Sequence, residues 1–102
     1  EVRGAETLDM LSAMNTGHDG SMSTIHANSA RDALRRVESL VLQHAANWSR
    51  EIVQDHVASS INAIVHVARN IDGSRFVKEV LLVSREGLSE VVLDGRVLRE
   101  VW

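Results

Sequence analysis

The first third of the sequence places two histidines and two glycines within ten residues. Gly17, His18 and Gly20 precede a run of small residues that ends at His26. A glycine-rich turn lets backbone N–H groups approach an anion closely. Imidazole side chains can hydrogen-bond a phosphate or orient a water molecule. The pattern indicates an anion or nucleotide site, although the same histidines could be structural, and the residues by themselves leave both interpretations open.

A metal site is the weaker interpretation of the same segment. His18, Asp19 and His26 could supply ligands for a metal-dependent hydrolase. Their spacing is not that of a helical metal motif, however, and the chain has no cysteine to assist. The three remaining histidines are expected beside packed faces, with no assigned role: His44, His56 and His66.

Composition narrows the class of protein. The 102 residues suffice for one domain, and the formal net charge is −3. Without a stripe of Lys and Arg, no binding of nucleic acid by this chain is expected. The lack of cysteine excludes disulfides and thiolate metal sites. No apolar run approaches the ~20 residues that span a bilayer, so we expect no direct membrane insertion and a cytoplasmic location.

Hydrophobic spacing predicts the helices that surround the histidines. Apolar residues at helical intervals predict a helix over residues 5–14, and residues 21–26 read as a short, buried, parallel strand. A helix over 29–44 is capped by Asn28 or Ser29, and another spans 49–59. The buried face of the 29–44 helix is predicted to be Ala30, Ala33, Leu34, Val37, Leu40 and Val41, and that of the 49–59 helix Ile52, Val53, His56 and Val57.

From Ile61 onward the hydrophobic pattern repeats every two residues instead of every three to four, which predicts a β meander. A strand over residues 61–68 with both faces largely covered leads into a hairpin at Asp72-Gly73. The return strand spans 75–84, a turn follows at 85–87, and a short hairpin occupies 90–101. The predicted fold class is α/β, with helices followed by an antiparallel meander.

Residues 1–29 resemble one family closely. Glu1-Val2-Arg3 matches the end of the second acidic motif of the type II/type IV secretion ATPase superfamily, and residues 17–29 match its His box (Gly-His, then Thr-Ile-His-Ala). The branch most similar is the one that drives Flp-type (tight-adherence) pilus assembly and conjugation. The resemblance divides residues 1–102 into an acidic motif end (1–4), the His box (17–29), a helical region (29–59) and the β meander (61–102).

The resemblance implies a role for each matching residue. Residues 1–102 would form the C-terminal portion of a RecA-like P-loop NTPase domain that hydrolyses ATP with Mg²⁺ in a homo-hexameric ring. Glu1 would orient the attacking water and hold Mg²⁺ indirectly through water, and His18 and His26 would sense the γ-phosphate. The supporting residues would be Arg3, Thr16, Gly17, Gly20 and Thr24. The implied partners are inner-membrane secretion or pilus platform proteins, with the ATPase peripheral to that membrane.

The sequence also departs from the family pattern. The phosphate-binding loop Gly-x-x-x-x-Gly-Lys-[Ser/Thr] does not occur, since Lys78 is the sole lysine and no such glycines precede it. The chain also begins without an initiator Met. We therefore expect a piece of a longer polypeptide that is inactive by itself. A non-catalytic α/β protein-interaction module is the alternative.

Overall fold

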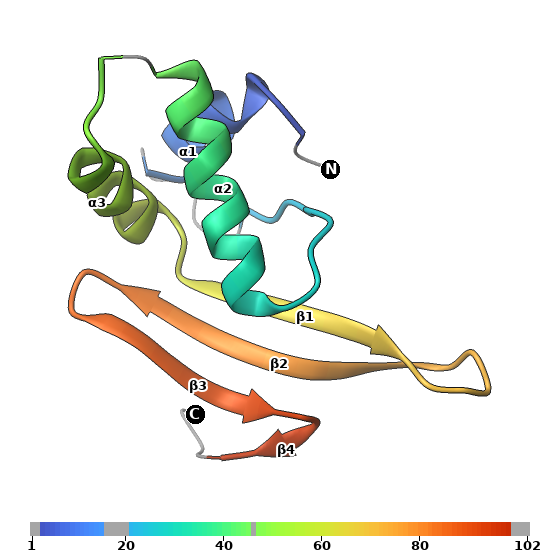
Figure 1. Ribbon diagram of the computed structural model, residues 1–102. Helices are drawn as coiled ribbons and strands as arrows, with labels where there is room; N and C mark the ends of the chain where they lie inside the picture. Colours follow the sequence, from blue (N-terminus) through green and yellow to red (C-terminus); the bar gives the residue numbers. More distant parts are fainter. Residues whose placement is uncertain (1–2, 16–20, 46, 99–102) are drawn as a thin grey trace.

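The computed structural model describes residues 3–15, 21–45 and 47–98. Three helices precede four strands in the chain: α1 (Glu6–Asn15), α2 (Ala30–His44), α3 (Arg50–Ser60), β1 (Ala63–Arg69), β2 (Arg75–Ser84), β3 (Gly87–Leu93) and β4 (Arg96–Val97). The strands form one antiparallel sheet in the order β1-β2-β3-β4. The helices lie together on one side of this sheet (Figure 1). The predicted class, helices followed by an antiparallel meander, is confirmed.

Helix α2 forms as its sequence predicts. Ser29 is the N-cap, and its hydroxyl accepts a hydrogen bond from the Asp32 N–H at 3.0 Å. This bond satisfies one of the free N–H groups of the first turn. All six residues predicted for the buried face are buried. The amphipathic spacing therefore predicted the orientation of the helix correctly, and of the two predicted caps, Asn28 and Ser29, the structure uses Ser29.

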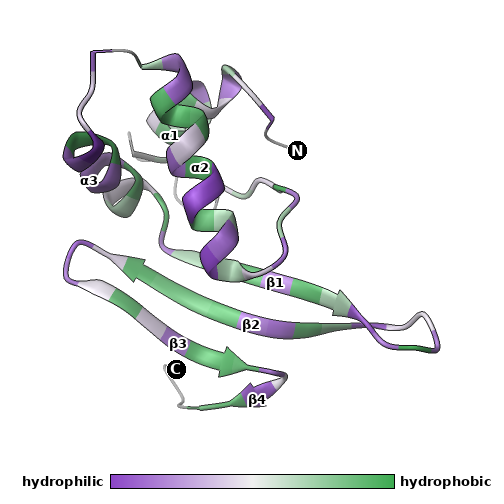
Figure 2. Cartoon of the chain, viewed as in Figure 1, coloured by the Kyte–Doolittle hydropathy of each residue, from purple (hydrophilic) through white to green (hydrophobic). Residues whose placement is uncertain are grey.

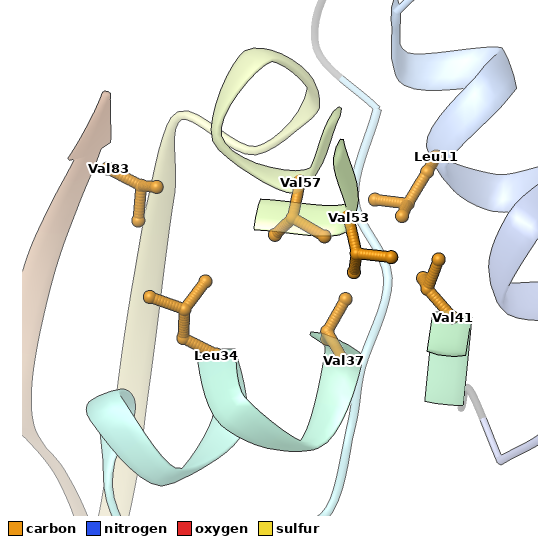
Figure 3. Packing of buried hydrophobic residues seen from close by; sticks show 7 residues of the cluster. All are labelled: Leu11, Leu34, Val37, Val41, Val53, Val57 and Val83. Carbon is orange, nitrogen blue, oxygen red and sulfur yellow. The ribbon is translucent and has the colours of Figure 1, made fainter. Parts of the chain in front are cut away.

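The hydrophobic core lies between the three helices and the adjoining end of the sheet. Its buried residues come from α1, α2, α3 and β2, and Figure 3 shows their side chains converging: Leu11, Leu34, Val37, Val41, Val53, Val57 and Val83. Val53 and Val57 are four residues apart, so they share one face of α3. Ile52, predicted to join them, is 52% exposed because it lies roughly 100° around the helix from Val53.

Trp48 closes the end of the core between α2 and α3. Its ring meets that of His56 edge-on, with centroids 5.1 Å apart and planes at 77°. This is a favoured arrangement for a pair of aromatic rings. The Nε2 atom of His56 is buried and has no hydrogen-bond partner among the described residues. His56 therefore packs beside the core, as the sequence predicts.

Three turns connect the four strands, at residues 70–74, 85–86 and 94–95, close to the predicted positions. Gly73 has a φ of +89° in the β1–β2 turn, where its N–H donates to the Asn70 carbonyl. Asp94 and Gly95 both have positive φ, at 52° and 78°, which is the geometry of a tight two-residue hairpin turn. Strand β3 begins at Gly87, earlier than predicted, and β4 comprises Arg96 and Val97. Residues 99–101 of the predicted last strand lie outside the described residues.

The two faces of the sheet differ in what covers them. Ile64, Leu81 and Glu90 lie opposite one another across β1, β2 and β3 and face the helices. The opposite face carries a row of valines that crosses all four strands: Val65, Val80, Val92 and Val97. Much of the sheet is hydrophobic in Figure 2, although none of the three described helices lies on this second side. The prediction that both faces of the 61–68 strand are covered is wrong, since Val65 is 55% exposed.

The predicted strand over residues 21–26 is also wrong. Residues 21–28 have no regular secondary structure, and Ser21 to Thr24 are exposed. A strand is stabilised by backbone hydrogen bonds to a neighbouring strand. No strand of the described residues pairs with this segment, so its small and apolar residues alone do not make it a strand here.

Candidate functional site

The start of α2, just after the predicted His box, is fastened to the sheet by two carboxylates. The Ala30 N–H donates to Glu79 Oε1 of β2 at 2.8 Å. The guanidinium of Arg31 donates from Nε and Nη2 to Glu90 Oε1 of β3, at 3.2 and 3.0 Å. These contacts hold the first turn of α2 over the middle of the sheet. They therefore also fix the position at which residues 21–28 join the helix.

The same contacts decide whether the start of α2 can bind an anion. The positive end of a helix dipole and its free N–H groups often bind phosphate. Here the Ser29 hydroxyl and the Glu79 carboxylate already accept hydrogen bonds from Asp32 and Ala30. A phosphate would have to displace the Glu79 carboxylate, which is also negatively charged. The start of α2 is therefore a structural anchor, and its Ala30 and Asp32 N–H groups are not available to an anion.

A groove of about 530 Å³ runs between that segment and the outer edge of β1, which pairs with no other described strand. We call it the β1 groove. Its walls are residues 21–27 on one side and Ala63 to Val67 on the other, with Met10, Met14 and Val37 among the residues of α1 and α2 that line it. The lining is mainly apolar, with polar atoms supplied by Thr24, His26 and His66 among others. Such a lining suits an extended apolar segment or a ligand oriented by a few polar groups.

The structure places three of the predicted site residues and brings two of them together. Thr24 and His26 both line the β1 groove, and both side chains are exposed. Arg3 lies apart from them, before α1. The other predicted site residues fall outside the described residues: Glu1, Thr16, Gly17, His18 and Gly20. Their roles remain predictions.

His66 is the residue of this region to which the sequence assigned no role. It lies on β1 opposite Glu79 of β2, and it lines the same groove as His26. The alternation along β1 puts His66 on the same face as Ile64, the face toward the helices. That alternation was visible in the sequence. What the sequence did not show is that residues 21–27 run past this edge of the sheet.

The turn before α1 is held by local hydrogen bonds. The N–H groups of Arg3 and Gly4 donate to Glu6 Oε1, at 2.7 and 3.2 Å. The buried Thr7 hydroxyl donates to the Gly4 carbonyl at 2.6 Å. The bond from the Arg3 N–H is the main cause that holds the pKa of Glu6 below its ordinary value. The turn following Glu1 and Val2 is therefore tied to the helix that packs on the core.

The described residues contain no group of three or more His, Cys, Asp or Glu side chains placed to hold a metal ion. Two of the three ligands considered for a metal-dependent hydrolase, His18 and Asp19, lie outside those residues. Across residues 3–15, 21–45 and 47–98, no helix has the length and apolar character needed to cross a membrane.

Comparison with known proteins identifies the family. The family model described as "Type II/IV secretion system protein" matches residues 1–93. The chain is 41% identical over 81 residues to the conjugal transfer protein TrbB of Rhizobium radiobacter, covering 79% of this chain and 24% of that protein. It is 32% identical over 84 residues to the type IV secretion system protein VirB11 of Brucella abortus, covering 78% of this chain and 23% of that protein.

A solved structure supports the same assignment. The VirB11 ATPase of the Brucella suis type IV secretion system, crystallised with sulphate, superposes with a TM-score of 0.72 and 29% identity, over 79% of this chain and 25% of that one. The chain belongs to the type II/IV secretion system protein family, and its fold is that of a part of such an ATPase. It spans about a quarter of the length of the curated relatives it matches.

Proposed function

We propose that this chain is the C-terminal portion of the catalytic domain of an ATPase that powers type II/IV secretion or Flp-type pilus assembly. The family match over residues 1–93 carries the proposal, and the similarity to a VirB11 ATPase structure supports it. The parent protein would hydrolyse ATP with Mg²⁺ as a homo-hexamer with a RecA-like catalytic domain. It would act in the cytoplasm, beside inner-membrane platform proteins of the secretion or pilus machine.

The chain's own residues would contribute charge and positioning at the phosphate end of the nucleotide. Bound ATP with Mg²⁺ would supply the phosphoryl group that passes to water. Glu1 would orient that water and contact Mg²⁺ through a water ligand. His18 and His26 would hydrogen-bond the γ-phosphate, supported by Arg3, Thr16, Gly17, Gly20 and Thr24. The exposure of Thr24 and His26 in the β1 groove fits this role, because both side chains are free to meet a ligand.

The test is His26→Ala in the full-length protein. Loss of a donor that stabilises developing charge on the γ-phosphate typically costs ~2 to 4 kcal/mol, which is roughly a hundredfold or more in turnover. Nucleotide affinity should be largely preserved, because the phosphate-binding loop makes most ground-state contacts. Turnover, nucleotide affinity and melting temperature are measured on the same preparation.

Gln43→Ala is the control. Gln43 is an exposed residue at the other end of α2, so its loss should leave turnover near that of the unmodified protein. A sharp fall in melting temperature for His26→Ala, with turnover per folded protein unchanged, would show that His26 is a packing residue and refute its assignment.

A non-catalytic interaction module remains the second candidate for the isolated 102-residue chain. The observation that favours it is that Lys78, in the middle of β2, is the sole lysine. A phosphate-binding loop lysine therefore has no candidate here. We expect no Mg²⁺-dependent phosphate release from this chain alone. Release above that of a His18→Ala, His26→Ala double variant would contradict that expectation.

A further inference from the structure

The hairpin formed by β1 and β2 projects beyond the helices as an arm (Figure 1). On the face of the sheet opposite the helices, pairs of like residues follow one another along this hairpin. Val67 lies opposite Val77, Arg69 lies opposite Arg75, and Ile71 stands at the tip with its side chain fully exposed. Exposed apolar residues gathered on a projecting element mark an interaction surface. We call residues 65–78, which form this part of the hairpin, the arm.

The arm is positively charged although the chain is negative. Residues 65–78 contain Arg69, Arg75 and Lys78 against one acid, Asp72, which gives +3 − 1 = +2. With a formal charge of −3 for the whole chain, the other residues sum to −3 − (+2) = −5. Neither Arg69 nor Arg75 forms an ion pair with any residue that the structure describes. Two like charges opposite each other across a strand pair are destabilising in isolation, so an acidic partner would relieve them.

A groove of about 440 Å³ with complementary properties lies at the other end of the sheet, which we call the α3 groove. Its apolar lining comprises Leu34, Val57, Ala58, Val83 and Leu88, and Glu38 and Asp55 supply carboxylates. Arg85, which also lines it, bonds to Asp55 at 3.2 Å. Because Arg85 pairs with Asp55, the groove lining has a net charge of −2 + 1 = −1, and Glu38 is its carboxylate outside that pair. An apolar floor beside this carboxylate suits an apolar tip flanked by arginines.

One molecule cannot fill its own groove. The arm begins where β2 starts, and the α3 groove is lined by Val83, Ser84 and Arg85 where β2 ends. Ten residues of strand separate these ends by about 30 Å, at ~3.4 Å per residue. A contact between two different patches on identical chains is head-to-tail, and it closes into a ring when the rotation between copies allows.

We propose that the arm of one copy docks in the α3 groove of the next copy and so joins neighbouring subunits of the ring. The occupant of the groove is therefore a second copy of this chain, chosen by charge complementarity and by the apolar fit of Ile71. The inference rests on the proposed function, which supplies the ring, and it names the contact that builds it.

Cysteine pairs provide the direct test, since this chain contains no cysteine. In the full-length protein, Ile71→Cys with Leu88→Cys should give a ladder of covalent oligomers after mild oxidation. A disulfide needs Cα atoms within about 7 Å, so this pair cannot close within one chain. Ile71→Cys with Asp9→Cys, at an exposed position of α1, should give no ladder, and neither should any of the single variants.

Charge reversal provides an independent test. Arg69→Glu with Arg75→Glu should weaken assembly about tenfold or more, because attractions become repulsions. Adding Glu38→Arg and Asp55→Arg should restore assembly. The matched control is Arg35→Glu with Arg96→Glu, which changes the charge equally at exposed sites outside the arm and the groove lining. Assembly is followed by sedimentation across a concentration series.

The outcomes separate this inference from the proposed function. If the full-length protein forms rings and hydrolyses ATP, but neither cross-links nor responds to charge reversal, the arm is not the subunit contact. Loss of binding to vesicles containing anionic lipid, with assembly intact in the Arg69→Glu, Arg75→Glu variant, would overturn it in favour of a membrane contact. A monomer without ATPase activity would refute the proposed function, and this inference with it.

Discussion

The two faces of the sheet use similar residues for different purposes. On the helix-covered face, Leu81 is 1% exposed and Val83 is 7% exposed. On the open face, Val65 and Val97 are 55% and 59% exposed. The first face stabilises the fold because its side chains leave water. The second contributes little to folding and remains available for binding, so an apolar strand sequence does not by itself indicate which of the two a residue serves.

The sharpest test of this difference uses two adjacent leucines of β2. Leu81→Ala should cost ~2 to 5 kcal/mol of unfolding free energy, because a fully buried side chain is removed and a cavity remains. Leu82→Ala removes the same atoms from the open face, where the side chain is half-buried, and should cost well under half as much. Urea melts of both variants make the measurement. Equal losses would mean that the open face is packed in the folded protein.

A smaller effect is expected at Leu34, on the helix that covers the sheet. Leu34 is 9% exposed and lines the α3 groove, so part of the space left by Leu34→Ala opens to solvent. The expected loss is about 2 to 3 kcal/mol, at the low end for a buried leucine. Arg35→Ala, the exposed neighbour, should cost under ~1 kcal/mol. The reverse ranking in urea melts would show that the orientation of α2 is wrong.

The contact of Glu79 with the start of α2 should contribute still less to the free energy of unfolding. Glu79→Gln keeps an acceptor for the Ala30 N–H but removes the negative charge from the positive end of the helix. The expected loss is about 0.3 to 1 kcal/mol. Glu86→Gln, exposed in the β2–β3 turn, is the control and should change stability little. No difference between the two variants in thermal melts would mean that the Glu79 contact is not maintained in solution.

The smallest effects concern pH. The pKa of Glu6 is lowered chiefly by the Arg3 N–H, and that of Asp72 by hydrogen bonds from Ser74. A carboxyl group with a lowered folded-state pKa stabilises the protein above its ordinary pKa, near 4.5 for Glu6 and 3.8 for Asp72. That stabilisation is lost as pH falls through the lowered value.

Melting temperature measured between pH 6 and pH 3 should therefore fall less steeply for Glu6→Gln and for Asp72→Asn than for the unmodified chain. Both side chains are exposed, and each variant should have a slightly lower melting temperature than the unmodified chain above the ordinary pKa of the carboxyl group and the same melting temperature at the acid end of the profile. An identical acid profile in the variants would show that these hydrogen bonds do not persist in solution.

The accuracy of sequence-based prediction followed how local each feature is. The buried face of α2 and the turns at Asp72-Gly73 and Asp94-Gly95 depend on residues a few positions apart, and the structure confirms them. The exposure of Val65 depends on whether a second layer covers the sheet. That is decided by distant parts of the chain, and the alternation along β1 carries no information about it.

The site shows the same limit. The sequence singled out His26, and the structure places it in a groove. It assigned no role to His66, because nothing local indicates that residues 21–27 run beside β1. The predicted strand over 21–26 failed for a related reason, since a strand is defined by its partner as much as by its residues. The family resemblance was more specific than the periodicity because it rests on particular residues at fixed spacing.

The edge-on contact between Trp48 and His56 gives this chain a built-in optical probe. Trp48 and Trp102 are its two tryptophans, so Trp102→Phe leaves the emission of Trp48 alone. That indole packs against the core where α2 gives way to α3. Its fluorescence would move to longer wavelength when α3 separates from the helical layer and water reaches the ring. Amide hydrogen exchange in β2 reports on the sheet in the same molecule. Comparing the two signals along one denaturation curve would show whether helices and sheet come apart together or in sequence.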